Sequence, residues 1–190
     1  MLKSAPFILQ GRDEGLVITL TELPALVADR YARAALKAID ADPDSGIAGL
    51  AFQHYADVAK LPGAHALLLP FVRGTVIENG APSRLDINEH LKGWRNIDRL
   101  EQAALMLHVA FLTDREPLDI PVAMQGAALM AGGSDLRVTF CSPAIAAVLN
   151  SRHADYVQLE TVLSTEDVYN LTECINVEAA REYAARKRDK

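Results

Sequence analysis

Hydrophobic and polar positions follow two different periods in the first forty residues. Phe7–Leu9 and Leu16–Leu20 are β-prone runs on either side of a loop rich in glycine and aspartate, and this arrangement predicts a β-hairpin. From about Glu22 to Ile39 the apolar residues recur every three or four positions, which predicts an amphipathic helix. Thr21 directly precedes that segment, and its hydroxyl is expected to cap the free amides of the first helical turn.

The rest of the chain contains further helical patterns, most of them with a recognisable capping residue. The predicted helices are residues 47–59, a short helix capped by Asp86, Ile97–Leu112 capped by Asn96, a helix from Ser142-Pro143 to Leu149, and a last helix capped by Ser164–Asp167. Two short strands are also expected. They are Thr75–Ile77, which an Asn79-Gly80 turn follows, and Val138–Phe140.

These elements predict a mainly α fold, with a helical bundle-like body, a short N-terminal β-hairpin and a small mixed C-terminal part. Proline and glycine punctuate residues 113–134, so we expect a hinge there. The chain then divides into a hairpin plus helical body at residues 1–112 and a C-terminal helical subdomain at residues 113–190, unless it forms one domain. Phe52 and Leu107 lie at the centres of the two clearest apolar stripes, and both are expected in the core.

Composition narrows the classes of function. The 190 residues are 50% hydrophobic but only 6% aromatic, and they carry a net charge of −6. Nucleic acid binding needs a basic face, so this acidic balance argues against it. The two cysteines are too few for a disulfide framework, Met1–Leu9 lacks the pattern of a signal peptide, and no apolar run is long enough to span a membrane. We expect a soluble cytoplasmic protein that binds neither nucleic acid nor membrane.

No motif in the sequence indicates catalysis or a bound cofactor. None of the five histidines has a second ligand at metal-binding spacing. Ser142 lacks the glycine-flanked elbow of a serine nucleophile, so a helix cap is its favoured role. His108 lies on the apolar stripe of its predicted helix and is expected to be half-buried. We therefore expect no catalytic, cofactor-binding or metal-binding residues and no enzyme activity.

Trp94 and Arg95 form the most distinctive local group. They lie between two predicted helices, and tryptophan and arginine dominate interaction hot spots. Alternatively, Trp94 closes one end of the core with its indole N–H on a carbonyl, and we favour this core role over an interface. The basic end, Arg186–Arg188, is interpreted as a helix terminus that complements the helix dipole, in preference to a binding tail.

A family resemblance rests on the first quarter of the chain. Leu2-Lys3 is followed by an aromatic residue that starts a strand, Phe7, and then by Val17–Leu26, which has the pattern "Val-x-Thr-Leu-[Ser/Thr]-Glu-Leu-x-Ala-Leu" and enters a helix. In these features the chain resembles the tail assembly chaperones of long-tailed (siphovirus-type) bacteriophages. The resemblance implies a non-catalytic assembly factor that coats the long, apolar tape measure protein before the tail tube polymerises and is absent from the finished particle.

The composition is consistent with this expectation, since a small Ala/Leu-rich helical protein can offer apolar grooves to a partner helix. The expected partner is the tape measure protein, with the major tail tube protein and a second copy of the chain as further candidates. The expected location is the cytoplasm of the bacterial host. Two alternatives remain: another phage structural or tail completion adaptor that shares only the hairpin-helix start, and a small enzyme whose carboxylates converge only in the fold.

Overall fold

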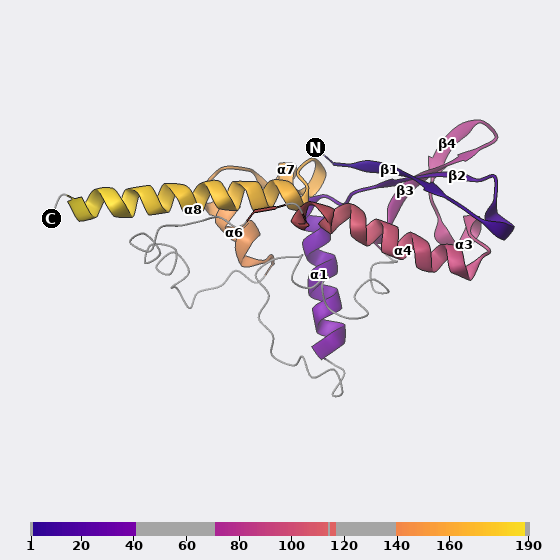
Figure 1. Cartoon of the computed structure of the whole chain (residues 1–190), viewed down its shortest axis with the longest axis horizontal. Helices are drawn as coiled ribbons and strands as arrows, with labels where there is room; N and C mark the ends of the chain where they lie inside the picture. Colours follow the sequence, from indigo (N-terminus) through magenta and orange to yellow (C-terminus); the bar gives the residue numbers. More distant parts are fainter. Residues whose placement is uncertain (1, 41–70, 114, 117–139, 189–190) are drawn as a thin grey trace.

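The described part of the protein is an α+β structure built on one antiparallel sheet (Figure 1). The computed structural model describes residues 2–40, 71–113, 115–116 and 140–188. The sheet has the order β1-β2-β3-β4, and its strands are β1 (Ser4–Ile8), β2 (Val17–Thr21), β3 (Arg73–Glu78) and β4 (Ala81–Arg84). The helices are α1 (Ala25–Asp40), α3 (Ile87–His90), α4 (Trp94–Val109), α6 (Pro143–Asn150), α7 (Tyr156–Thr161) and α8 (Thr165–Arg188), with 3-10 turns η1 (Gly11–Asp13) and η3 (Ala110–Leu112).

The predicted fold class, a mainly α bundle-like body with only a short hairpin, is wrong. The N-terminal hairpin exists, with Phe7 opposite Ile18 and Ile8 opposite Val17. However, β3 pairs with β2 and β4 pairs with β3, so the hairpin is half of a four-stranded sheet. Because β2 and β3 lie far apart in the sequence, their pairing leaves no local signature. β4 is short and contains Pro82, which weakens its strand pattern.

The turn between β3 and β4 follows the predicted Asn79-Gly80 signal. Asn79 has φ 52° and Gly80 has φ 81°, the two positive values that a type I′ hairpin turn needs. The other predicted strand, Val138–Phe140, cannot be followed, because its first two residues lie outside the described ranges, and Phe140 itself is not in a strand. The predicted helix 47–59 and most of the hinge at residues 113–134 also lie outside those ranges.

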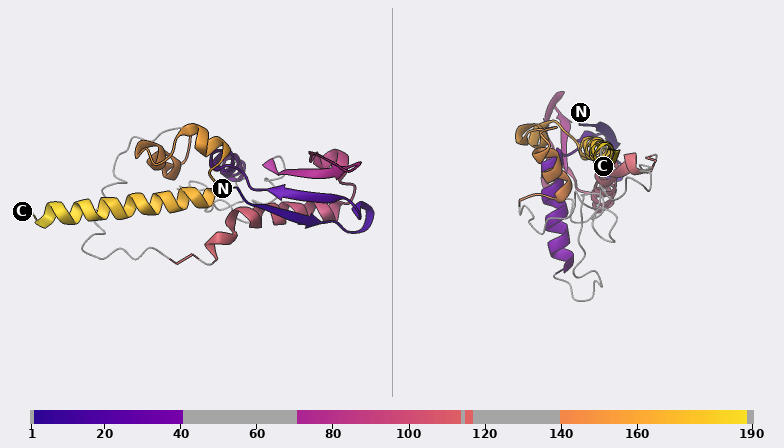
Figure 2. Two further views of the ribbon diagram at one scale, coloured as in Figure 1. Left: turned by 90° about the horizontal axis from the view of Figure 1, so that it is seen from above. Right: turned by 90° about the vertical axis from the view of Figure 1, so that its left-hand side faces the viewer.

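One face of the sheet carries the main core. Phe7, Ile18 and Val76 lie in one cross-strand row and are buried. Figures 1 and 2 show α4 lying along this face of the sheet, where Leu100 and Ala104 belong to the same apolar cluster. We call this the sheet cluster. Leu107, expected at the centre of the α4 stripe, is only partly buried against it, while Leu100 is fully buried.

A second apolar cluster, the helical cluster, joins α1 to the C-terminal helices. Its buried members are Ala25, Leu26, Cys141, Ile145, Val148, Ala154, Leu159 and Val168. α1 contributes to both clusters, because Val27 and Tyr31 on its other side belong to the sheet cluster. Helix α8 leaves this cluster and extends away from the sheet (Figure 1). The division at residues 112 and 113 stays a prediction.

The start of α1 differs from the expectation. Thr21 does not cap the helix, because it is the last residue of β2 and pairs with Ser4 and Arg73. α1 begins only at Ala25, whose N–H donates to the carbonyl of Leu163 (2.8 Å). Thr21 therefore takes part in the sheet and does not serve as a helix cap.

The other predicted caps have mixed outcomes. The Asp86 cap is confirmed, since its carboxylate accepts the N–H of Asn88 (3.0 Å), and at the start of α8 Ser164 and Asp167 accept each other's N–H groups (2.8 and 3.2 Å). Ser142 occupies the N-cap position of α6, but its hydroxyl makes no cap bond. Asn96 lies inside the first turn of α4 instead of preceding it.

Candidate interaction surface

Trp94 is displayed at the N-terminus of α4. Its side chain is 72% exposed, so the core role favoured for it is wrong. The exposed Arg95 stacks on the same indole, with the guanidinium carbon 5.4 Å from the ring centroid. A role for Trp94 and Arg95 in an interface remains a prediction, and the exposure of both side chains is what such a role requires.

Asp13 anchors the helix start that presents Trp94. This buried carboxylate, in the loop between β1 and β2, accepts the N–H groups of Lys92 (2.9 Å) and Gly93 (2.9 Å) and the side-chain amide of Asn96 (2.7 Å). The Asn96 amide also donates to the carbonyl of Gln10 (2.8 Å). Asp13 therefore fixes the segment that leads into α4, because it accepts N–H groups of the two residues before the helix and the side-chain amide of a residue in its first turn.

The electrostatics of this contact favour the ionised form of Asp13. The hydrogen bond from Asn96, with those from the backbone N–H groups of Lys92 and Gly93, lowers the pKa of the Asp13 carboxyl against the opposing effect of burial. Gly93 allows this close approach, because a Cβ there would lie 2.9 Å from Asp13 Oδ2. Because its pKa is lower in the folded protein, ionised Asp13 stabilises the fold above the pKa of the unfolded chain. This stabilisation is lost as the pH falls through the pKa of the folded protein.

We expect Asp13→Ala to destabilise the protein by about 2 kcal/mol, because it leaves the part-buried N–H groups of Lys92 and Gly93, just before α4, without their acceptor. Urea denaturation of the variant measures this change. Glu14→Ala is the matched control, since Glu14 is exposed in the same loop, and it should change the free energy of unfolding by less than about 0.5 kcal/mol. Equal effects of the two substitutions would contradict the assigned role of Asp13.

The outer face of the sheet, opposite α4, carries an exposed line of apolar side chains. Ile8 lies opposite Val17 and Ile77 opposite Pro82. Val17 and Ile77 adjoin the paired residues Ile18 and Val76, so these four side chains form one row across all four strands. We call it the apolar row. Ile8, Val17 and Ile77 are 75%, 56% and 42% exposed, which means that no described element covers them.

Arginines accompany the apolar row on this face. Arg84 lies opposite Thr75 and Arg73 opposite Thr21, at positions that alternate with the inward-facing Val76 and therefore point outward. Both are exposed, and no ion pair joins either one to a described residue. No outward position of the four described strands carries Asp or Glu. The outer face is thus locally basic in an acidic protein.

Two buried titratable side chains hold the corner between β2 and α1. The N–H of Leu23 donates to His108 Nε2 (2.7 Å), and His108 Nδ1 contacts the carbonyl of Ala104, so the ring proton sits on Nδ1. Burial lowers the pKa of His108 to about 4. The histidine is fully buried, not half-buried as expected. Glu22 is also buried, accepts the N–H of Lys3 (3.0 Å), and has its pKa raised by burial. Both side chains therefore bind backbone N–H groups, His108 that of Leu23 and Glu22 that of Lys3.

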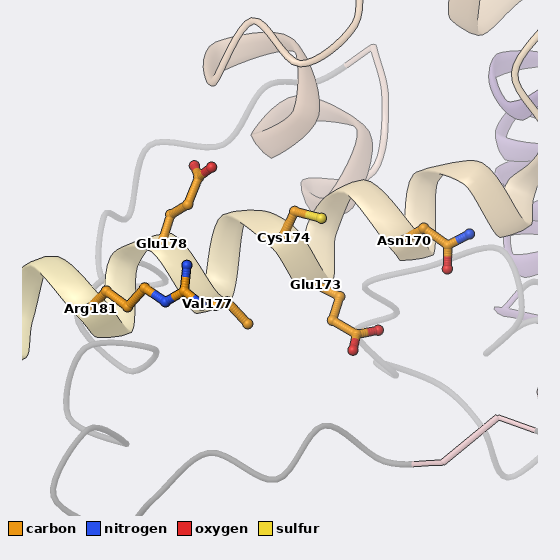
Figure 3. Close-up of a pocket in the computed structure, with 6 residues that line it drawn as sticks. All are labelled: Asn170, Glu173, Cys174, Val177, Glu178 and Arg181. Carbon is orange, nitrogen blue, oxygen red and sulfur yellow. The ribbon is translucent and has the colours of Figure 1, made fainter.

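The remaining candidates for chemistry are unremarkable in their surroundings. Burial raises the pKa of the Cys141 thiol to about 11, so it is no nucleophile at neutral pH. A groove of about 430 Å³ runs along α8 (Figure 3), and its described lining, which includes Glu173, Cys174 and Arg181, comes from that one helix. Ligand sites are formed by polar groups that converge from several elements. Within the described residues, no group of His, Cys, Asp and Glu could hold a metal ion.

The sequence pointed to Trp94 and Arg95 but missed the apolar row and Asp13. A signal for the row exists in hindsight, since Ile8 and Val17 are apolar at positions of opposite parity to the buried Phe7 and Ile18. Asp13 has no comparable signal, because its partners are about eighty positions away in the sequence.

Comparison of the chain with protein-family models, curated proteins and solved structures found no match. Within the described ranges, no helix combines the length and the apolar character needed to cross a membrane.

Proposed function

We propose that this protein is a non-catalytic phage tail assembly chaperone that binds the tape measure protein and keeps it soluble until the tail tube assembles. The observation that carries the proposal is the Val17–Leu26 run, together with Leu2-Lys3 and Phe7, on which the family resemblance rests. In this proposal the chain acts in the host cytoplasm, is not an enzyme and leaves before the particle is complete.

The position of that run in the fold supports the proposal in one respect. Ile18, Leu20, Leu23 and Leu26 are all buried, and together they join the sheet cluster to the helical cluster. A sequence pattern at the joint between the two clusters would be kept by proteins that share the whole scaffold, whatever partner each one binds.

The physical properties of the expected partner also support the proposal. A tape measure protein is a long, largely helical chain whose apolar stripe would aggregate if it stayed uncovered. A chaperone for it needs exposed apolar surface on a body that stays soluble. The described residues supply such surface at Trp94 and along the apolar row, while the net charge of −6 keeps many bound copies apart.

The proposal predicts that the purified chain captures helical segments of the tape measure protein encoded in the same gene cluster. Charge reversal of Arg186, Lys187 and Arg188 to glutamate should leave this capture intact, because the recognition is assigned to apolar surface and not to the basic end. Copurification from cells that produce both proteins measures it. No capture by the wild-type chain would contradict the proposal, whereas capture lost only with the reversed tail would assign the recognition to the basic end.

A further inference from the structure

We propose that the outer face of the sheet, centred on the apolar row of Ile8, Val17, Ile77 and Pro82, docks an amphipathic α-helix whose apolar stripe is flanked by carboxylates. The inference rests on the proposed chaperone function for its biological partner, and it adds the surface and the chemistry of recognition. Three properties of the face support it: the exposure of the row, its length, and the charge beside it.

Exposure separates this row from the rest of the sheet. Each strand contributes one side chain to the row. The exposed fractions of Ile8, Val17 and Ile77 range from 42% to 75%. An antiparallel sheet normally keeps polar side chains on its solvent face. A contiguous apolar line at those positions is therefore typical of a surface that a partner covers.

The length of the row fits a helix. Three spacings between neighbouring strands amount to roughly 14 Å, and a helix rises about 5.4 Å per turn, so nearly three turns of a partner helix can lie along the row. The edges of the sheet do not favour an added strand instead. Pro6 in β1 and Pro82 in β4 each remove an N–H from an edge strand.

The positive charge beside the row favours partner helices that carry negative charge. Arg84 is two positions along β4 from Pro82, or roughly 7 Å, and Arg73 is four positions along β3 from Ile77. Both lie on the same side of the row, have no ion partner among the described residues, and face no carboxylate from the outward strand positions. A helix with glutamates along the flank that faces β3 and β4 would pair with them, whereas lysines there would be repelled.

The test uses two synthetic helical peptides of about 18 residues, each with a leucine stripe at helical spacing and either glutamates or lysines along its flanks. Fluorescence anisotropy with the full chain measures binding. The glutamate peptide should bind at least about tenfold more tightly than the lysine peptide, and Arg73→Glu with Arg84→Glu should remove or invert this preference. Arg181→Glu on α8 is the matched control and should not change it.

A second pair of variants tests the row itself. Val17→Thr with Ile77→Thr keeps β-branched side chains at exposed strand positions, so the fold should persist, as circular dichroism and the Tm can confirm. These changes should weaken binding of the glutamate peptide about tenfold. Val157→Thr, at a valine of α7 that is 66% exposed, should leave this binding unchanged. Peptides that bind with equal affinity, row variants that bind like the wild type, or a dimer of the chain that the row variants dissolve would each overturn the inference.

The same variants separate this inference from the chaperone proposal. If the wild-type chain captures tape measure segments and the row variants capture them equally well, the chaperone function stands and the docking surface is wrong. If the chain binds the glutamate peptide through the row but captures no tape measure segment, the docking surface stands and the chaperone function is wrong.

Discussion

Replacement of Leu100 by alanine is expected to lower the free energy of unfolding by about 3 kcal/mol. Leu100 is fully buried on α4 and packs in the sheet cluster with Phe7, Ile18 and Val76 from three different strands. The substitution removes its apolar contacts and leaves a cavity that neither the sheet nor the helix can close, and such changes cost about 2–5 kcal/mol. Chemical denaturation followed by circular dichroism measures the change.

Met106→Ala is the matched control, because Met106 lies on the same helix and is mostly exposed. It should change the free energy of unfolding by less than about 0.5 kcal/mol. If both substitutions shift the unfolding midpoint by the same amount, then α4 does not present Leu100 to the sheet.

Acidification is expected to destabilise the protein through His108, by up to about 3 kcal/mol between pH 6.5 and pH 4. Burial lowers the pKa of His108 from 6.5 to about 4. The unfolded chain therefore takes up a proton over this pH window and the folded chain does not, so stability falls as the pH falls and levels off below about 4. A shift of this size corresponds to about 3 kcal/mol. Protonation would also end the hydrogen bond that Leu23 donates to Nε2.

The pH dependence of the free energy of unfolding, compared between the wild type and His108→Gln, isolates this effect. The comparison is needed because Glu22, whose pKa burial raises, contributes stability that is lost as the pH rises. The slope between pH 4 and 6.5 should be smaller in His108→Gln and unchanged in His153→Gln, which alters an exposed histidine. Equal slopes in all three proteins would show that His108 is not neutral in the folded state.

Local signals in the sequence predicted local structure well. The Phe7–Leu9 and Leu16–Leu20 runs form the expected hairpin, Asn79-Gly80 forms the expected turn, and Ser164 and Asp167 cap the last helix. Each of these features forms between residues that are close in the sequence, so the local pattern of side chains is enough to predict it.

The errors lie where distant segments meet. β2 continues through Thr21 because Ser4 and Arg73 pair with it from both sides, and no local pattern reports the second pairing. α4 starts before Asn96, at Trp94, where Asp13 of the hairpin loop holds the two preceding residues by their N–H groups. Trp94 is exposed because this anchored start points it away from both clusters, a direction that the residue type alone does not fix.

The candidate surface illustrates the same division. The choice of Trp94 and Arg95 followed from residue type, while the apolar row depends on the register of four strands. Ile8 belongs to a continuous apolar run, so its outward direction becomes visible only once Phe7 is placed opposite Ile18.

We propose that the chain keeps an apolar, helical tape measure protein in solution. The most direct measurement is the soluble fraction of that protein when it is produced with and without this chain, followed by copurification of the two. The tape measure protein is expected to be mostly insoluble alone, and to become soluble and copurify when it is produced with the chain. A soluble fraction that is the same in both cases, with no complex recovered, would contradict it.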